Sequence, residues 1–141
     1  MLADCGLYAR WLFQQIVRLG WHPLLRINQG GHFRPAGSGG FRPLPTFAPP
    51  PGRRWRGAGT AFVTPACQLT CTLLASWAEG GADPWLLLTD LPPAAADAGG
   101  YGLRAWIEQG FKLTTRGGWQ GQRTRMTDAD RASRRWLVVA V

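Results

Sequence analysis

Acidic residues and lysine are scarce in this sequence. Eight Asp and Glu accompany sixteen Lys and Arg, which leaves a formal net charge of +8. Fifteen of the sixteen basic residues are Arg, and a planar guanidinium pairs with two phosphate oxygens at once. This imbalance favours a polyanion as the partner, and an arginine-rich chain without such a partner is the alternative.

Cysteine is too rare for a disulfide framework. The cysteines are Cys5, Cys67 and Cys71; they form no C-x-x-C pair, and one is left over if two bridge, which indicates a reducing compartment. A zinc site made of Cys67, Cys71, His22 and His32 is disfavoured. C-x3-C lies at the edge of the usual ligand spacing, and the two histidines are ten residues apart. We interpret them as strand cysteines and polar loop histidines.

Long apolar runs are also missing. The longest uninterrupted ones, 84–88 and 136–141, are far shorter than the ~20 residues of a membrane-spanning helix. Asp4 and Arg10 interrupt the apolar run that a secretory signal needs. We therefore expect a cytoplasmic protein with no membrane partner.

The chain contains enough apolar residues to form a hydrophobic core. Its 141 residues are 45% hydrophobic and include eight Trp, which is typical of a globular protein and not of a disordered one. Only three residues precede Asp4, and the sequence stops inside the apolar run 136–141 with no cap. We expect the chain to be a fragment of a longer protein, or a short open reading frame from a decayed element.

The first part of the chain has an α/β pattern. Apolar residues at helical spacing predict a helix over 7–19 that ends at Gly20. The next residues, 22–27, predict a strand. In this order Asp4 lies at the end of a preceding short strand, where α/β proteins commonly place their ligands.

The middle of the chain is rich in β structure. Residues 28–59 are dense in Gly, Pro and Arg and predict turns with short strands. Better strands are expected over 60–64, 68–77 and 85–91. Alternation within the second of these predicts one apolar face, composed of Leu69, Cys71, Leu73, Ala75 and Trp77.

A helix is predicted over 94–115, after two prolines. Gly99, Gly100 and Gly102 weaken its first half, at about 1 kcal/mol each relative to alanine. A helix broken before Tyr101 is therefore the alternative.

On this helix, Tyr101, Arg104 and Glu108 are three and four residues apart, so they share one face. The segment resembles the Y-x2-R-x3-E-x6-K signature of bacterial insertion-sequence transposases, which are DDE enzymes, and specifically the group called insertion-sequence family four. Three further blocks resemble the family in the same order, and they are 4–9, 85–90 and 117–131. The resemblance thus extends over almost the whole chain.

The resemblance implies an α/β architecture, namely a partial ribonuclease-H-like fold interrupted by a β-rich insertion. Residues 1–27 would be the core element that carries the family's second aspartate. Residues 28–91 would be the insertion. Residues 92–141 would be the helical core element that carries the glutamate.

The resemblance also implies a transposase that uses Mg²⁺, or Mn²⁺ as a substitute, for cleavage and strand transfer of DNA phosphodiesters. Asp4 and Glu108 would be its catalytic acids and metal ligands. The family's first aspartate lies on a strand upstream of Met1. Asp90 is not taken as the missing acid, and we interpret it as capping the turn before Pro92.

The DNA contacts implied by the family are incomplete here. Tyr101 and Arg104 would contact the phosphate backbone near the transposon end, and the alternative is a core tyrosine and an ion-paired arginine. The family's lysine position is occupied by Thr115. Lys112, three residues earlier, and Arg116, about 100° around the helix, are the candidates for supplying that charge.

The implied partners are double-stranded DNA, both as transposon terminal repeats and as target, and a second copy of the full-length protein in a homodimer at the nucleoid. Without the first aspartate and the lysine, we expect the isolated chain to be inactive in cleavage. The rival hypothesis is a catalytically inactive, arginine-rich DNA-binding remnant. A third is a basic structural or interaction protein, which would show no salt-sensitive DNA binding.

Overall fold

The computed structural model describes residues 1–3, 9–77 and 81–112. The side chains of Ala3, Ala105, Glu108 and Phe111 are outside this description. The chain divides into two compact units, Met1–Tyr101 and Gly102–Val141. Each unit is described by itself.

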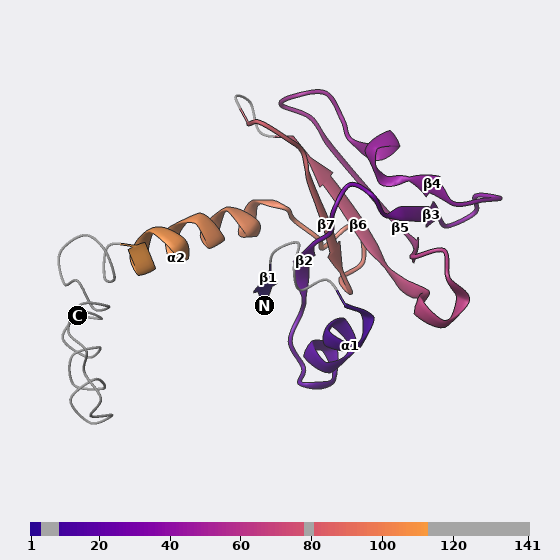
Figure 1. Ribbon diagram of the computed structural model, residues 1–141, viewed down its shortest axis with the longest axis horizontal. Helices are drawn as coiled ribbons and strands as arrows, with labels where there is room; N and C mark the ends of the chain where they lie inside the picture. The colour runs from indigo at the N-terminus through magenta and orange to yellow at the C-terminus, as the bar shows by residue number, and fades with distance from the viewer. Residues whose placement is uncertain (4–8, 78–80, 113–141) are drawn as a thin grey trace. The chain divides into compact units, whose positions relative to one another are not determined.

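The first unit is built on a seven-stranded sheet with the order β1-β2-β7-β6-β5-β3-β4 (Figure 1). Its strands are β1 (Leu2–Ala3), β2 (Leu24–Arg26), β3 (His32–Pro35), β4 (Arg42–Pro43), β5 (Arg54–Ala61), β6 (Leu69–Ser76) and β7 (Trp85–Thr89). Only β1 and β2 are a parallel pair among these strands, and α1 (Arg10–Arg18) lies between them in the chain. The remaining neighbours are antiparallel. The described chain is therefore mixed α/β, with a largely antiparallel sheet.

Helix α1 forms because its apolar residues recur on one side. Phe13 and Ile16, three residues apart, are buried against the sheet, and Leu12 packs beside them. Gly20 adopts φ +75°, the left-handed conformation that ends many helices. Residues 7 and 8, the predicted start of this helix, lie outside the residues that the structure describes. Trp11 is one of the apolar residues at helical spacing, but it is 66% exposed and does not belong to the buried side.

The strand predicted over 60–64 is wrong in its position. Strand β5 covers Arg54–Ala61 and pairs with β6 along its whole length, from Arg54 opposite Ser76 to Ala61 opposite Leu69. It ends there because Phe62 adopts φ 69°, which is incompatible with an extended strand. The predicted strands over 22–27, 68–77 and 85–91 are confirmed with shorter bounds.

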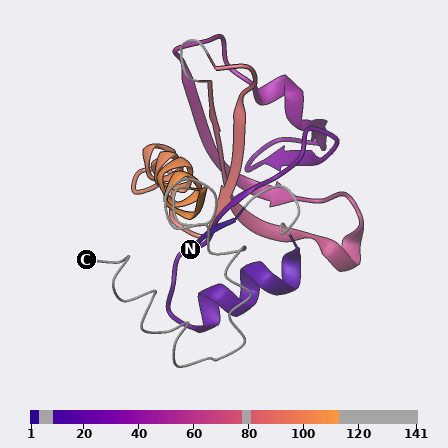
Figure 2. The same ribbon diagram turned by 60° about the vertical axis from the view of Figure 1, so that its left-hand side comes forward.

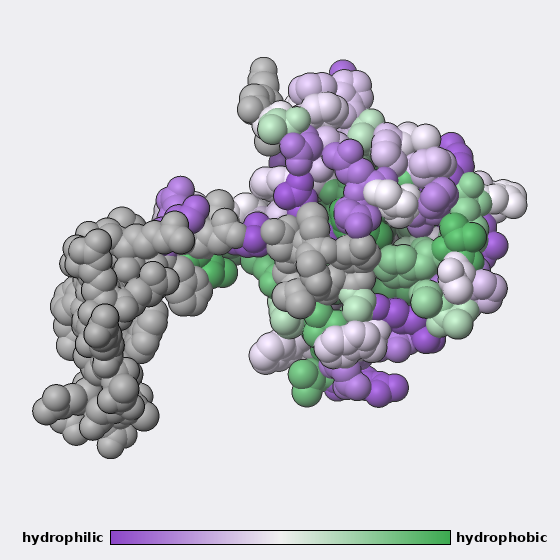
Figure 3. Space-filling model, in the orientation of Figure 1, coloured by the Kyte–Doolittle hydropathy of each residue, from purple (hydrophilic) through white to green (hydrophobic). Residues whose placement is uncertain are grey.

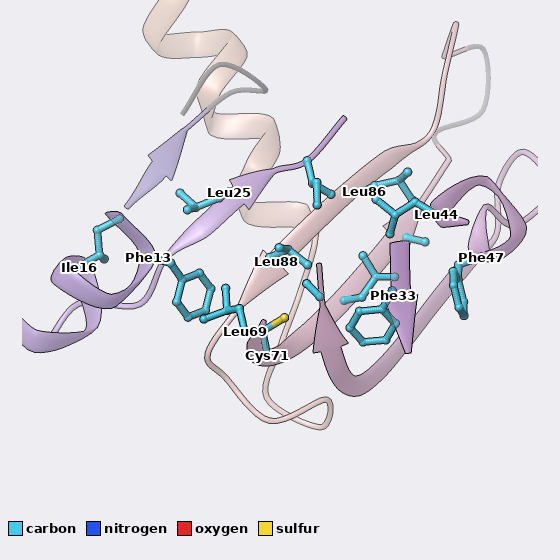
Figure 4. Packing of buried hydrophobic residues seen from close by; sticks show 14 residues of the cluster. Phe13, Ile16, Leu25, Phe33, Leu44, Phe47, Leu69, Cys71, Leu86 and Leu88 are labelled. Carbon is cyan, nitrogen blue, oxygen red and sulfur yellow. The ribbon is translucent and has the colours of Figure 1, made fainter. Parts of the chain in front are cut away.

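The sheet is covered on both faces. The predicted apolar face of β6 is confirmed for its first four members, Leu69, Cys71, Leu73 and Ala75, which join a core closed by α1 and by the 3-10 helix η1 (Leu44–Phe47) (Figure 4). In Figure 4, Phe13 and Ile16 lie at one end of this core, and Phe33 and Phe47 lie at the other. The opposite face buries Leu74 and Leu87 under Ala96, Ala98 and Tyr101.

The helix predicted over 94–115 is broken, as its glycines had suggested. The segment runs through turns and the 3-10 helix η3 (Gly99–Gly102) before α2 (Leu103–Lys112) begins. Residues 94–98 were therefore wrongly assigned to the helix, since Pro92 starts a turn in which its carbonyl accepts from Ala95 and Ala96. The predicted residues 113–115 lie outside the description.

The predicted boundary between a core element, 1–27, and a β-rich insertion, 28–91, remains an expectation. In the structure, β2 from the first predicted part pairs directly with β7 from the second, at Leu25 opposite Leu88 and Arg26 opposite Leu87.

Candidate metal and nucleic-acid site

The parallel β1–α1–β2 segment is where the sequence had placed a catalytic acid. Leu2 lies opposite Leu24 and Ala3 lies opposite Leu25, and the Leu24 amide donates to the Met1 carbonyl at 2.8 Å. Asp4 follows β1 directly in the sequence but lies outside the described residues. In α/β proteins, the carboxyl ends of parallel strands are where ligand-binding residues gather.

The second predicted acid, Glu108, is in helix α2, and its side chain is outside the description. The backbone positions of Arg104, Glu108 and Lys112 are four residues apart, so they follow one side of the helix. Arg104 is half-buried and Lys112 is exposed. Arg116, the other basic candidate, and Thr115 lie outside the described residues.

Tyr101 belongs to the core of the first unit. It is 3% exposed, and its ring lies edge-on to Trp85 with 5.3 Å between ring centroids. This is the packing of a core tyrosine, which the sequence had offered as the alternative to a phosphate contact. A role of its hydroxyl on DNA stays a prediction.

Asp90 does not cap the turn before Pro92, contrary to the interpretation from the sequence. Thr89 Oγ1 accepts the Leu91 amide at 3.4 Å. The Asp90 carboxylate instead turns to His22, whose Nδ1 lies 2.9 Å from Asp90 Oδ2. The side-chain acceptor in this turn is thus the hydroxyl of Thr89, a residue that is 1% exposed.

The other oxygen of Asp90, Oδ1, is buried and has no hydrogen-bond partner among the described residues. Asp90 also lines an open groove of about 490 Å³ beside α1, together with Arg10, Gln14, Arg18 and Gln68. The groove therefore combines two cations with one carboxylate.

Of the residues in the disfavoured zinc site, Cys71 lies in β6, His32 is the first residue of β3 and not in a loop, and His22 precedes β2. Burial raises the pKa of the Cys71 thiol to about 12, although a backbone hydrogen bond with Ala61 acts in the opposite direction. Cys67 is exposed and is the last residue of the 3-10 helix η2 (Pro65–Cys67), so it is not a strand cysteine as interpreted from the sequence. Within the described ranges, no three His, Cys, Asp or Glu are grouped as a metal site.

An acid-free stretch is the feature that the sequence reasoning missed. Between Asp4 and Glu79 the sequence has no Asp or Glu, and it has eight Arg. The total charge does not reveal this stretch, whereas a search for the longest run without acids finds it. The eight are Arg10, Arg18, Arg26, Arg34, Arg42, Arg53, Arg54 and Arg56.

Half of these arginines have partners within the fold. Arg26 Nη2 lies 2.8 Å from Asp83 Oδ2, and Arg54 Nη1 lies 3.3 Å from Asp97 Oδ1. Arg10 donates to the Ala66 carbonyl at 3.2 Å. Arg56 donates to the Ala96 carbonyl at 3.3 Å.

Two others, Arg34 and Arg42, lie on aromatic rings. The Arg34 guanidinium carbon is 4.8 Å from the ring centroid of Phe41, and that of Arg42 is 4.7 Å from the centroid of Phe47. Over the part of the chain that the structure describes, neither has a carboxylate within ion-pair distance. Figure 3 shows hydrophilic residues interspersed with apolar ones over the visible face of this unit.

Comparison with known proteins assigns no family: no family model matches the chain, and no curated protein matches it. Within the described residues, no helix is long and apolar enough to cross a membrane.

Proposed function

We propose that the chain is part of the catalytic domain of a DDE transposase with a ribonuclease-H-like core, acting on double-stranded DNA. In the proposed reaction, water cleaves a phosphodiester at the transposon end and frees a 3′ hydroxyl. That hydroxyl then attacks a target phosphodiester and displaces its 3′ oxygen. The full-length protein would act as a homodimer on paired ends.

One observation carries this proposal: the order of elements around the two acids. A short strand, β1, is followed in the sequence by Asp4, then by α1 and the parallel strand β2. Antiparallel strands follow, and a helix with Arg104 and Glu108 comes after them. This is the order in which the resembling family arranges its second aspartate, its β-rich insertion and its glutamate.

The donor chemistry of the two acids fits a hard divalent ion. Asp4 and Glu108 both offer carboxylate oxygens, the ligands that Mg²⁺ prefers. The bound ion would supply positive charge for the attacking and leaving oxygens. Arg104, half-buried on the same helix as Glu108, would hold a phosphate of the DNA backbone.

The rival proposal is a non-catalytic DNA-binding remnant. The run of eight Arg without an acid supports DNA binding under either proposal, because phosphate contacts dominate affinity for nucleic acid. The two differ in the use of the carboxylates, so metal binding separates them.

The deciding experiment is a Mn²⁺ titration of the purified chain, followed by electron paramagnetic resonance, for the parent and three variants. Asp4→Ala and Glu108→Ala should each weaken Mn²⁺ binding by about tenfold or more, as loss of a ligand would. Asp90→Ala is the matched control, because its carboxylate is held by His22, and it should bind as the parent does. Equal binding by all four proteins would favour the remnant.

A further inference from the structure

The β3–β4 hairpin is the edge of the sheet farthest from β1 in the strand order. Its two arginines lie on opposite faces. Arg42 is opposite Phe33 in the register and lies over Phe47, on the core face. Arg34 follows Phe33 in the strand, so its side chain points to the other face, where it lies over Phe41.

The hairpin is held firmly against the sheet. Phe33 is completely buried and contacts Phe47 edge-on, with 5.7 Å between ring centroids. Gly59 on β5 permits this close approach, because a Cβ there would collide with the Arg34 carbonyl oxygen and the Phe33 ring. The two guanidiniums therefore project from a fixed base.

Within the turn of the hairpin, residues 36–40 have small side chains or none. Gly37 adopts φ +76°, and an added Cβ at Gly37, Gly39 or Gly40 would meet nothing within 4 Å. Residues 36–40 are all exposed. A ligand can therefore approach the backbone of this turn closely.

Within the acid-free stretch, Arg34 and Arg42 are distinguished by their rings. A cation over an aromatic face keeps its N–H groups available at the rim of the guanidinium. Such an arginine also has less rotamer freedom left to lose on binding, which lowers the entropic cost of a phosphate contact. Arg53 carries the same charge and is exposed, but it lies over no aromatic ring among the described residues.

We propose that the β3–β4 hairpin is a second DNA-binding element, in which Arg34 and Arg42 each contact a phosphate of duplex DNA on either side of the inserted hairpin. This inference rests on the proposed function for its partner, DNA. The major groove of B-form DNA, about 12 Å wide, accepts a two-stranded β ribbon, and its two walls are phosphate backbones. Contact through phosphates alone makes the element independent of DNA sequence.

A duplex suits the hairpin better than a single strand does. Single strands are bound largely by stacking their bases on aromatic rings, but Phe47 is 5% exposed and a guanidinium lies over each ring. A-form RNA is also a poorer fit, because its major groove is deep and narrow.

The test measures affinity of the full 141-residue chain for a duplex DNA of about 30 base pairs, by fluorescence anisotropy between about 50 and 200 mM salt. Arg34→Ala and Arg42→Ala should each weaken binding about fivefold and lower the slope of log affinity against log salt by about 0.9. Arg53→Ala removes the same charge and should change both much less. Phe41→Leu removes the ring under Arg34, so it should weaken binding. Because it keeps every charge, it should leave the salt slope unchanged.

Thermal melting of each variant checks that the fold is intact, and the Arg53→Ala protein is the reference. Two results would overturn the proposal: equal effects of all three arginine variants, or tighter binding to single-stranded DNA or to an RNA duplex than to duplex DNA. Loss of binding in Arg104→Ala but not in the hairpin variants would overturn it and leave the proposed function standing. Loss in the hairpin variants with no effect of Asp4→Ala on Mn²⁺ binding would support the hairpin and contradict the proposed function.

Discussion

The imidazole of His22 and the carboxylate of Asp90 join the neighbouring antiparallel strands β2 and β7 at one end of this pair. Nδ1 of His22, the second residue before β2, lies 2.9 Å from Oδ2 of Asp90, the first residue after β7. This contact gives Asp90 a role in the fold, and it accounts for an acid at a position where the family resemblance requires none.

Replacing Asp90 should therefore affect stability and leave ligand binding unchanged. Asp90→Asn weakens a partly exposed carboxylate–imidazole contact, so we expect a loss of about 0.5–1 kcal/mol in the free energy of unfolding. Urea denaturation measures this, with His22→Ala as a matched variant that should lose a similar amount. Non-additive losses in the double variant would establish the pair, whereas additive losses would contradict it.

Close packing at Gly59 should be sensitive to a single methyl group. Gly59→Ala places a Cβ against the Arg34 carbonyl oxygen and the Phe33 ring, so we expect it to lose about 1–3 kcal/mol, as overpacked sites do. Gly39→Ala is the control, because an added Cβ there meets nothing within 4 Å. Chemical denaturation compares them, and equal stability of the two variants would contradict the packing.

Burial of Cys71 predicts a pH-dependent stability. Because the pKa of its thiol rises from 9.0 to about 12 in the folded state, the folded chain holds this proton at pH values where the unfolded chain has lost it. The contribution is fully present below pH 9.0 and is lost progressively as the pH rises toward 12. Cys71→Ala should therefore lose less stability than the parent between those pH values. Parallel stability curves for the two proteins would contradict the effect.

The same burial should protect Cys71 from alkylation. In a Cys5→Ser background, a thiol reagent at neutral pH should modify the exposed Cys67 quickly and Cys71 at the rate of unfolding. Mass spectrometry after limited reaction measures the two rates. Equal rates at both thiols in the native protein would contradict the burial.

The parts of the fold that depend on local pattern were predictable. Alternation in β6 identified the inward residues Leu69, Cys71, Leu73 and Ala75 because strand side chains have a period of two. Glycines between 99 and 102 correctly indicated the break before α2. The sequence prediction put this strand at 60–64 and missed most of β5, because the Arg and Gly residues of β5 have low strand propensity. Long-range pairing with β6 overrides that propensity.

The candidate site was less accessible to sequence reasoning. The packing of Tyr101 on Trp85 and the His22–Asp90 contact join residues far apart in the chain, and no spacing rule predicts such contacts. The ring-supported pair Arg34 and Arg42 depends on the hairpin register. The run without acids, in contrast, was present in the sequence and needed only to be counted.

If Asp4 and Glu108 are ligands of the proposed divalent metal site, localised cleavage of the chain will reveal both of them beside the metal. Fe²⁺ in place of Mg²⁺, with ascorbate and peroxide, produces radicals that cut the backbone beside the ion. We expect two cuts, one near residue 4 and one near residue 108, that excess Mg²⁺ suppresses and that Asp4→Ala and Glu108→Ala each abolish at both positions. Cleavage that is absent, diffuse, or confined to one position in the parent protein would contradict it.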